Sequence, residues 1–444
     1  MRSPVRSRLG AANSVRRVDW ESRISTRNTP SARPFRQSGR SRRTRRTTAA
    51  TALLLSCVLA TASCASAKTT PNASTAPETS GGSSSAAAPE TSASSASASS
   101  ASASSSLSGL TPVQLAGQRV IYSFSGTTVP SSLLKLIRAG EVGGVIFFAD
   151  NISSSAELAA DSAELVAAQK QSTVHLPLLL MTDQEGGEVR RIAGGNPTQS
   201  ELSIGESSSP ASAATTAGAG AAETLSNAGL NVNLAPVLDV YATPGNFIDE
   251  FQRSYSNDPQ IVSQAGAAFI AAQQKGGVAA TAKHFPGLGT ASTGADTDTV
   301  PVTLNEPLSQ LRSVDELPYR AAISVGVDLI MVSWAIYPAL DAKRPAGLSS
   351  TIVQGELRQR LGYGGVTITD ALEAGALQAF GGPGQRAVDA AGAGMDLLLC
   401  SSGSVTQGEE ATQALASALQ GGQLTSDSFN AAVARVDALR TKLG

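Results

Sequence analysis

From Leu107 to Gly444, short apolar runs alternate with longer alanine-rich stretches, and this alternation restricts the fold more than any other feature of the sequence. The short runs are rich in branched side chains and mostly continuous in apolar character, as expected of parallel strands that are covered on both faces. Eight of these runs are predicted strands: Arg119–Phe124, Gly144–Phe148, Leu178–Met181, Val232–Leu238, Val278–Ala282, Leu329–Ser333, Val366–Thr369 and Met395–Leu399.

The stretches between these runs are predicted helices: Leu133–Ala139, Ser155–Lys170, Ala211–Ala228, Pro259–Lys275, Pro318–Val325, Thr351–Leu361, Gly384–Gly392 and Glu409–Gln420. Strands that alternate with helices in this way predict an α/β fold, a single (β/α)8 barrel of the TIM type, over residues 107–444. An open doubly wound sheet is the alternative. No glycine-rich phosphate-binding signature directly follows a predicted strand.

Residues 1–63 have the composition of an arginine-rich head followed by an export signal. Asp19 and Glu21 are the only acids among the first 50 residues, so the rest of the chain is acidic although the total formal charge is −1. The apolar run over residues 48–62 is shorter than the roughly 20 residues of a membrane-spanning helix. A basic segment, a short apolar run and small residues at its end are typical of an export signal, which predicts that the protein is exported.

The residues after this run predict an anchor and a tether. The segment Thr61–Cys64 resembles a bacterial lipobox, in which the cysteine is lipidated, but threonine replaces the usual aliphatic residue three positions before Cys64. Secretion without a lipid is the alternative. Residues 64–106 are almost wholly Ser, Ala, Thr, Pro, Gly and Glu, and such a segment buries too little apolar surface to fold. They are predicted to form a disordered tether between the outer face of the membrane and the barrel.

Polar and ionisable residues collect at the ends of the predicted strands. In barrels of this type the chemistry lies at the carboxyl ends of the strands. A purely structural pattern would scatter charge along helix faces, because charge next to a buried strand costs desolvation energy. The residues at or just after the strand ends are Asp150-Asn151, Asp183-Gln184-Glu185, Asp239, Lys283-His284, Ser333-Trp334, Asp370 and Ser401.

Five segments, taken together and in this order, resemble glycoside hydrolase family 3, and within it the bacterial β-N-acetylhexosaminidases. They are Thr182–Arg191, Asn233–Asp239, Arg253–Tyr255, Lys283–Gly289 and Thr369–Leu372. The resemblance implies a single barrel that hydrolyses terminal β-linked N-acetylglucosamine with retention of configuration.

The resemblance also implies roles for single residues. Asp370 would be the nucleophile, and Asp183, Arg253, Lys283 and His284 would bind the sugar hydroxyls. The residue types agree with this chemistry, because a retaining glycosidase needs one carboxylate that attacks the anomeric carbon and a second group about 5 Å away that protonates the leaving oxygen.

Each of these residues also has a simpler structural role open to it. Asp370 could cap the next helix, and Arg253 could form an ordinary salt bridge. Asp239 is predicted either to bind sugar or to fix Lys or Arg side chains without touching it. Trp334 could stack on a sugar or pack in the core. Glu185 is predicted to order its loop rather than to catalyse.

The loop after Lys283–Gly289 departs from the family. Members of this branch carry an Asp-x-His pair there, in which the histidine is the general acid and base. Residues 294–299 have no histidine, and His175, which precedes a strand, is predicted to lie at the opposite end of the barrel. Three outcomes stay open: Asp298, in the histidine's place, or Asp296 could donate the proton; the acid could come from elsewhere; or catalysis could be weakened.

These features define three functional hypotheses. The first is an exported, exo-acting β-N-acetylhexosaminidase that acts on peptidoglycan or muropeptide fragments and is held to the membrane by lipidated Cys64. The alternatives are a β-glucosidase-like family 3 hydrolase and a lipoprotein that binds muropeptides without cleaving them. The acidic barrel region argues against nucleic acid as a partner. Two distant histidines and Cys400, which lies in an apolar run, predict no metal site, and no cofactor is expected.

Overall fold

The computed structural model describes residues 109–444. The predicted export signal, the tether and Cys64 therefore lie outside the described residues, as do the boundaries assigned to them. No helix among residues 109–444 combines the length and the apolar character that crossing a bilayer requires.

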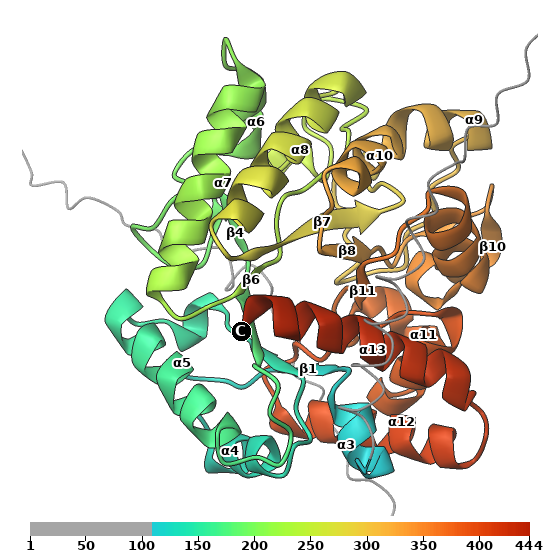
Figure 1. Ribbon diagram of the computed structural model, residues 1–444. Coiled ribbons are helices and arrows are strands. Elements are labelled where there is room, and N and C mark those ends of the chain that lie inside the picture. Colours follow the sequence, from blue (N-terminus) through green and yellow to red (C-terminus); the bar gives the residue numbers. More distant parts are fainter. Residues whose placement is uncertain (1–108) are drawn as a thin grey trace, which may run out of the picture. The chain divides into compact units, whose positions relative to one another are not determined.

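Parallel strands form the centre of the described chain (Figure 1). Their order is β11-β8-β7-β6-β3-β2-β1-β12, every neighbouring pair is parallel, and a further parallel bridge between Ile368 and Leu397 joins the two ends of the order. The sheet is thus an almost closed barrel, as predicted. The eight strands are β1 (Val120–Tyr122), β2 (Gly144–Ile146), β3 (Leu179–Thr182), β6 (Val232–Asn233), β7 (Ala279–Phe285), β8 (Leu329–Val332), β11 (Val366–Thr369) and β12 (Leu398–Leu399).

Helices and short hairpins surround these strands. All eight predicted helices are present, the one from Thr351 as a wide π-type helix. The helices are α3 (Pro112–Gly117), α4 (Ser131–Arg138), α5 (Ser155–Gln169), α6 (Glu201–Gly205), α7 (Pro210–Asn227), α8 (Pro259–Lys275), α9 (Leu308–Gln310), α10 (Leu317–Ser324), α11 (Pro383–Ala393), α12 (Val405–Gln420) and α13 (Ser426–Leu443). The shorter or wider turns are η1 (Ala149–Asn151), η2 (Asp249–Phe251), η3 (Leu311–Asp315), η4 (Ala346–Leu348), η5 (Thr351–Arg360) and η6 (Gly375–Phe380), and the hairpins pair β4 (Gln184–Gly186) with β5 (Val189–Arg190) and β9 (Ile336–Tyr337) with β10 (Asp341–Pro345).

The strand side chains divide between an inner and an outer core. On β3, for example, Leu179 and Met181 pack inside the barrel with residues of the other strands, whereas Leu180 packs outward against the helical layer. This alternation follows from the period of two along a strand. It explains why the strand runs read as continuously apolar, since both of their faces are buried.

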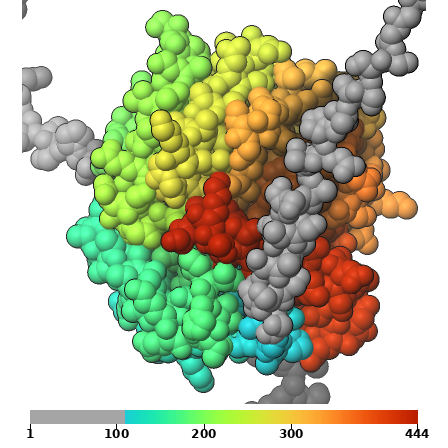
Figure 2. Space-filling view, viewed as in Figure 1, coloured from blue at the N-terminus to red at the C-terminus, as the bar shows by residue number. Residues whose placement is uncertain are grey.

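Helix α13, which is not among the predicted helices, covers the amino-terminal end of the barrel. Its Val436 and Leu439 belong to the inner core, and buried Arg440 donates to the carbonyl oxygens of Leu176 and Pro177, just before β3. Figure 1 shows this helix across the front of the strands, and Figure 2 shows its atoms, in red, in the middle of the same face. The carboxyl ends of the strands are therefore at the opposite end.

Two strands differ from their predicted lengths in ways that matter for the rim. Strand β7 continues to Phe285 and so carries Lys283 and His284 within the strand. Strand β6 is short, but the chain after it still runs beside β7, since the N–H of Lys283 donates to the Pro236 carbonyl at 3.2 Å and the N–H of Leu238 donates to the Lys283 carbonyl at 2.7 Å. Strand β7 and the chain after β6 therefore bring their polar residues together at the carboxyl end of the barrel.

Candidate active site

Four charged residues form a connected cluster at the carboxyl ends of the strands. Lys283 Nζ lies 2.9 Å from Asp183 Oδ1 and 2.7 Å from Glu185 Oε1. Arg253 donates through Nε and Nη2 to the two oxygens of Glu185 at 2.8 and 2.9 Å. The Glu185 side chain is 2 % exposed, whereas those of Asp183 and Arg253 are 13 % and 16 % exposed. Glu185 is thus the buried member of the cluster, whereas Asp183 and Arg253 are partly accessible to solvent.

The opposite charges in this cluster stabilise the ionised form of each member. Burial alone would raise the pKa of the Glu185 carboxyl, but Arg253 and Lys283 outweigh it and hold that pKa below its usual range. Burial likewise opposes ionisation of Asp183, and Lys283 and Arg191 lower its pKa. The pKa of Lys283 is raised in spite of its burial, because Asp183 and Glu185 face it. All four groups therefore keep their charges at neutral pH.

His284 is held by a buried carboxylate. Its Nδ1 lies 2.7 Å from Asp239 Oδ2, while Asp239 Oδ1 accepts the backbone N–H of His284 at 3.2 Å and of Leu288 at 2.7 Å. The Asp239 side chain is fully buried. A fully buried Asp239 is not placed to contact sugar, and its hydrogen-bond partner is His284, not the predicted Lys or Arg. Asp239 thus orients the imidazole, which leaves His284 Nε2 as the hydrogen-bonding edge.

Asp370 follows β11 directly and is half-buried at the rim. Its Oδ1 accepts the N–H of Ala371 at 2.8 Å. The next helical turn, η6, begins at Gly375 and has Ala374 as its N-cap residue. Asp370 is consequently not the cap of that turn, which removes the structural alternative raised for it.

Asp296 and Asp298 lie in different surroundings although only Thr297 separates them. Asp296 is 9 % exposed, and Asp298 is exposed. Burial raises the pKa of Asp296, and the negative charge of Asp370 raises it further, against the effects of the Asp298 N–H and of Arg253. Asp296 therefore interacts electrostatically with Asp370 and with Arg253 of the charged cluster. The N–H of Asp298 donates to Asp296 Oδ1 at 2.9 Å.

Trp334 does not present a face for a sugar. Its side chain has no exposed surface, and its Nε1–H donates to the Ala371 carbonyl at 2.8 Å. The stacking role considered for Trp334 is thus wrong for this geometry, and the packing alternative holds. The indole instead supports the chain immediately after Asp370.

Other polar residues of the predicted rim are structural. Asn151 is buried and donates to the carbonyl oxygens of Phe124 and Gly126. Ser401 bonds to both oxygens of Glu373. These contacts hold neighbouring loops together at the rim.

Two further residues escaped the sequence interpretation. Arg191, on the segment that resembles the family, lies 3.7 Å from Asp183. Glu201 is buried behind the cluster, where its Oε1 accepts the N–H of Val237 at 2.9 Å, and burial together with the charge of Glu185 raises its pKa well above the usual value. No strand-end position marks Glu201, since it begins helix α6, so strand patterns could not reveal it.

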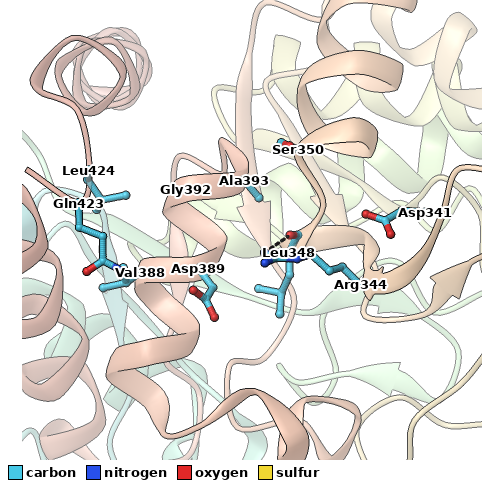
Figure 3. A pocket seen from close by; sticks show the side chains of 10 residues that line it. All are labelled: Asp341, Arg344, Leu348, Ser350, Val388, Asp389, Gly392, Ala393, Gln423 and Leu424. Atoms are coloured by element: carbon cyan, nitrogen blue, oxygen red, sulfur yellow. Dashed lines mark hydrogen bonds between the residues drawn. The ribbon is translucent and has the colours of Figure 1, made fainter.

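A cavity of about 330 Å³ lies elsewhere, among β10, η4, α11 and the turn before α13. Figure 3 shows the hydrogen bond from Arg344 to the Leu348 carbonyl, and it shows Asp389 on α11 across the cavity. None of the residues of the charged cluster lines this cavity.

Comparisons with known proteins identify the family of the chain. Residues 118–439 match the model of the Glycosyl hydrolase family 3 N terminal domain. An uncharacterized secreted glycosyl hydrolase of Arthroderma benhamiae is 50 % identical over 328 residues, which are 74 % of this chain and 93 % of that protein. Beta-hexosaminidase A of Pseudoalteromonas piscicida is 32 % identical over 371 residues, which are 75 % of this chain and 62 % of the relative.

Solved structures of family 3 enzymes are also similar to this chain. A family 3 beta-N-acetylglucosaminidase from Paenibacillus superposes with a TM-score of 0.71 at 36 % identity, over 76 % of this chain and 63 % of that one. A beta-N-acetylhexosaminidase from Beutenbergia cavernae gives a TM-score of 0.67 at 32 % identity, over 75 % of this chain and 99 % of that one. The family match spans more than half of the chain, and the chain belongs to glycosyl hydrolase family 3.

Proposed function

We propose that this glycoside hydrolase is a retaining, exo-acting β-N-acetylhexosaminidase that removes terminal β-linked N-acetylglucosamine. The observation that carries the proposal is the pairing of Asp370 with the buried carboxyl of Asp296, beside the cluster of Asp183, Glu185, Arg253 and Lys283. The activities named for the Pseudoalteromonas and Paenibacillus relatives support the choice of sugar.

In the first step, the Asp370 carboxylate attacks the anomeric carbon, and the bond from that carbon to the leaving oxygen breaks. Asp296 gives its proton to that oxygen, so the aglycone departs as an alcohol. In the second step, Asp296 removes a proton from water, the water oxygen attacks the anomeric carbon, and the ester to Asp370 is cleaved. The sugar leaves with its configuration retained.

The electrostatics of Asp296 suit both steps. An acid catalyst must be protonated before the first step, and burial together with ionised Asp370 raises the pKa of Asp296. Once Asp370 has become an ester, its negative charge is gone, and the pKa of Asp296 falls. Asp296 can then act as the base. Asp298 does not share this environment, because its side chain is exposed.

The charged cluster suits the recognition of hydroxyl groups. Asp183 offers acceptor oxygens, whereas Arg253 and Lys283 offer N–H donors in fixed directions, and His284 is oriented by Asp239. Hydrogen bonds to charged groups are roughly twice as strong as neutral ones. These four side chains are therefore the proposed contacts of the terminal sugar.

Peptidoglycan or its muropeptide fragments are the proposed natural substrate, reached by an exported enzyme that a lipid on Cys64 holds at the membrane. The support is the export signal and the lipobox-like segment in the sequence, together with the secreted Arthroderma relative. Replacing Cys64 with serine should release the protein from membranes into the medium; retention of the variant would contradict the lipid anchor.

The activity is tested with two matched substrates. The purified protein should hydrolyse 4-nitrophenyl N-acetyl-β-glucosaminide much faster than 4-nitrophenyl β-glucoside, with initial release of the β-anomer followed by NMR. Faster cleavage of the glucoside would favour a β-glucosidase-like enzyme. Binding of muropeptides without turnover of either substrate would favour a glycan-binding protein.

A further inference from the structure

The loop that carries Asp296 is docked on the turn that follows Asp370. The N–H of Gly375 donates to the Asp298 carbonyl at 2.7 Å, and the N–H of Ala376 donates to the Thr297 carbonyl at 3.0 Å. Gly375 and Ala376 are the first two residues of η6. Two successive backbone bonds therefore join the loop to the chain segment of the proposed nucleophile.

Gly375 makes this approach possible because it has no side chain. A Cβ at this position would lie 2.2 Å from the Thr299 oxygen, 2.4 Å from its carbonyl carbon and 2.9 Å from its Cα. All three are backbone atoms, which cannot turn aside as a flexible side chain could. Any other residue at position 375 must push the loop away from η6 or move η6 itself.

The position of the docked segment is transmitted directly to Asp296. Asp296 Oδ1 accepts the N–H of Asp298, and the Asp296 carbonyl accepts the N–H groups of Thr299 at 3.1 Å and Val300 at 2.9 Å. The loop thus forms a tight turn around Asp296. A displacement of Thr299 would carry the Asp296 carboxyl with it.

The turn η6, on which the loop is docked, belongs to the chain segment that follows Asp370. The N–H of Leu372 donates to the Leu399 carbonyl on β12 at 3.0 Å, and the Ala371 carbonyl accepts the N–H of Ala374 and the indole N–H of Trp334. The segment from Asp370 to η6 is therefore fixed on the barrel. The segment from Asp370 to η6 thus both carries the proposed nucleophile and holds the Asp296 loop.

We propose that Gly375 is a positioning residue that seats the Asp296 loop on η6 and thereby sets the placement of the acid against Asp370. The inference rests on the proposed function and deepens it. It concerns the backbone contact between loop and turn, whereas the proposed function concerns the side chains.

The test compares Gly375→Ala with Gly382→Ala, since a Cβ at Gly382 would meet nothing within 4 Å. Initial rates are measured with N,N′-diacetylchitobiose, whose leaving alcohol needs protonation, and with the 2,4-dinitrophenyl glycoside, whose leaving group does not. Gly375→Ala should lose roughly 10²-fold in kcat/KM on the disaccharide, as misplacement of a catalytic group by about 1 Å can cost. Cleavage of the aryl glycoside in the first step should change little, and Gly382→Ala should resemble the unaltered enzyme.

The pH profile separates positioning from general damage. Moving Asp296 into water and away from Asp370 lowers its pKa, so the alkaline limb of kcat/KM should shift to lower pH in Gly375→Ala. Equal losses on both substrates with an unchanged pH profile would overturn the proposal, as would rates like those of the unaltered enzyme. Failure of the unaltered enzyme to cleave either N-acetylglucosaminide would instead contradict the proposed function.

A second variant covers the case in which Gly375→Ala does not fold. Ala376→Pro removes the N–H that bonds to the Thr297 carbonyl, at the second position of η6, where proline is tolerated. It should produce the same selective loss on the disaccharide and the same direction of pH shift. A folded Ala376→Pro protein with unchanged selectivity would contradict the proposal.

Discussion

The charged cluster around Lys283 and the loop around Asp296 lie at the same rim, but they are held in different ways. Side-chain ion pairs of 2.7 to 2.9 Å join Lys283, Glu185, Asp183 and Arg253. Backbone hydrogen bonds from Gly375 and Ala376 hold the Asp296 loop. The first arrangement depends on which side chains are present, whereas the second depends on how closely two backbones can approach.

This difference predicts that the two regions respond differently to substitution. Within the cluster, loss of one partner leaves a buried charge uncompensated, so its members depend on one another. In the loop, the family's histidine can be absent while the neighbouring carboxyl takes a shielded position beside Asp370. The sugar-binding region should therefore be intolerant of substitution, and the acid region should depend on placement.

The largest expected effect is at the point where the two regions meet. Asp370→Asn removes the proposed nucleophile and should lower kcat on the order of 10⁴-fold or more, for activated aryl glycosides and natural disaccharides alike. Rates are measured on both substrates, and mass spectrometry checks for the glycosyl-enzyme. Persistent turnover with a covalent sugar on another residue would contradict the assignment.

The next effect distinguishes the two loop carboxyls. Asp296→Asn should lose about 10²–10⁴-fold in kcat/KM on the disaccharide, because general acid assistance is worth that much for a poor leaving group. The matched variant Asp298→Asn should lose far less, since the Asp298 side chain is exposed. Steady-state kinetics on chitobiose decide between them. A larger loss in Asp298→Asn would assign the acid to Asp298 instead.

A third variant probes the cluster alone. Glu185→Gln leaves Lys283 and Arg253 without their shared buried carboxylate and should cost roughly 3–5 kcal/mol of folding free energy, with a raised KM. Lys442→Gln is the control, because the Lys442 side chain that pairs with Asp328 is 52 % exposed, and such pairs contribute little. Denaturant unfolding measures both, and similar stabilities would contradict the central role given to Glu185.

The smallest effect concerns the strand end below the cluster. Asp315 packs against Gly287, and burial, with Glu306 and Asp239, raises its pKa from 3.8 to about 8. Between these values the unfolded chain releases the proton while the folded protein keeps it, so folding stability falls as pH rises from about 4 to about 8. Asp315→Asn cannot titrate and should reduce that fall. Unfolding at pH 5 and pH 8 tests this; an unchanged pH dependence would contradict it.

The parts of the fold that could be predicted are those with a repeating signal. The eight strands are all present because runs such as Val366–Thr369 are buried on both faces, and Asp370 stands at a strand end for the same reason. Helix α13 was missed although its buried residues Phe429, Ala432, Val433 and Val436 recur at helical spacing. What the period does not reveal is that this face covers the end of the barrel, because that contact involves strands from distant parts of the chain.

The site divides in a similar way. Asp183, Glu185 and Lys283 could be predicted because they lie at or near strand ends, whereas Arg253 was indicated only by the family resemblance. Glu185 proved more central than its loop-ordering role suggested. Burial of Trp334 and Asp239 could not be predicted, since it depends on residues from distant parts of the chain. The different burial of Asp296 and Asp298 could not be predicted either, because the loop is held by backbone contacts with η6, about 80 residues further along the chain, which leave no side-chain pattern.

Rescue by azide is the most direct test of the claim that Asp296 is the acid and base. In Asp296→Ala, the 2,4-dinitrophenyl N-acetyl-β-glucosaminide should still form the glycosyl-enzyme, but water should release it slowly because no base remains. Azide needs no deprotonation, so it should accelerate turnover and yield the β-configured glycosyl azide, identified by NMR. Absence of acceleration and of the azide product in Asp296→Ala, with rescue in Asp298→Ala, would contradict the account.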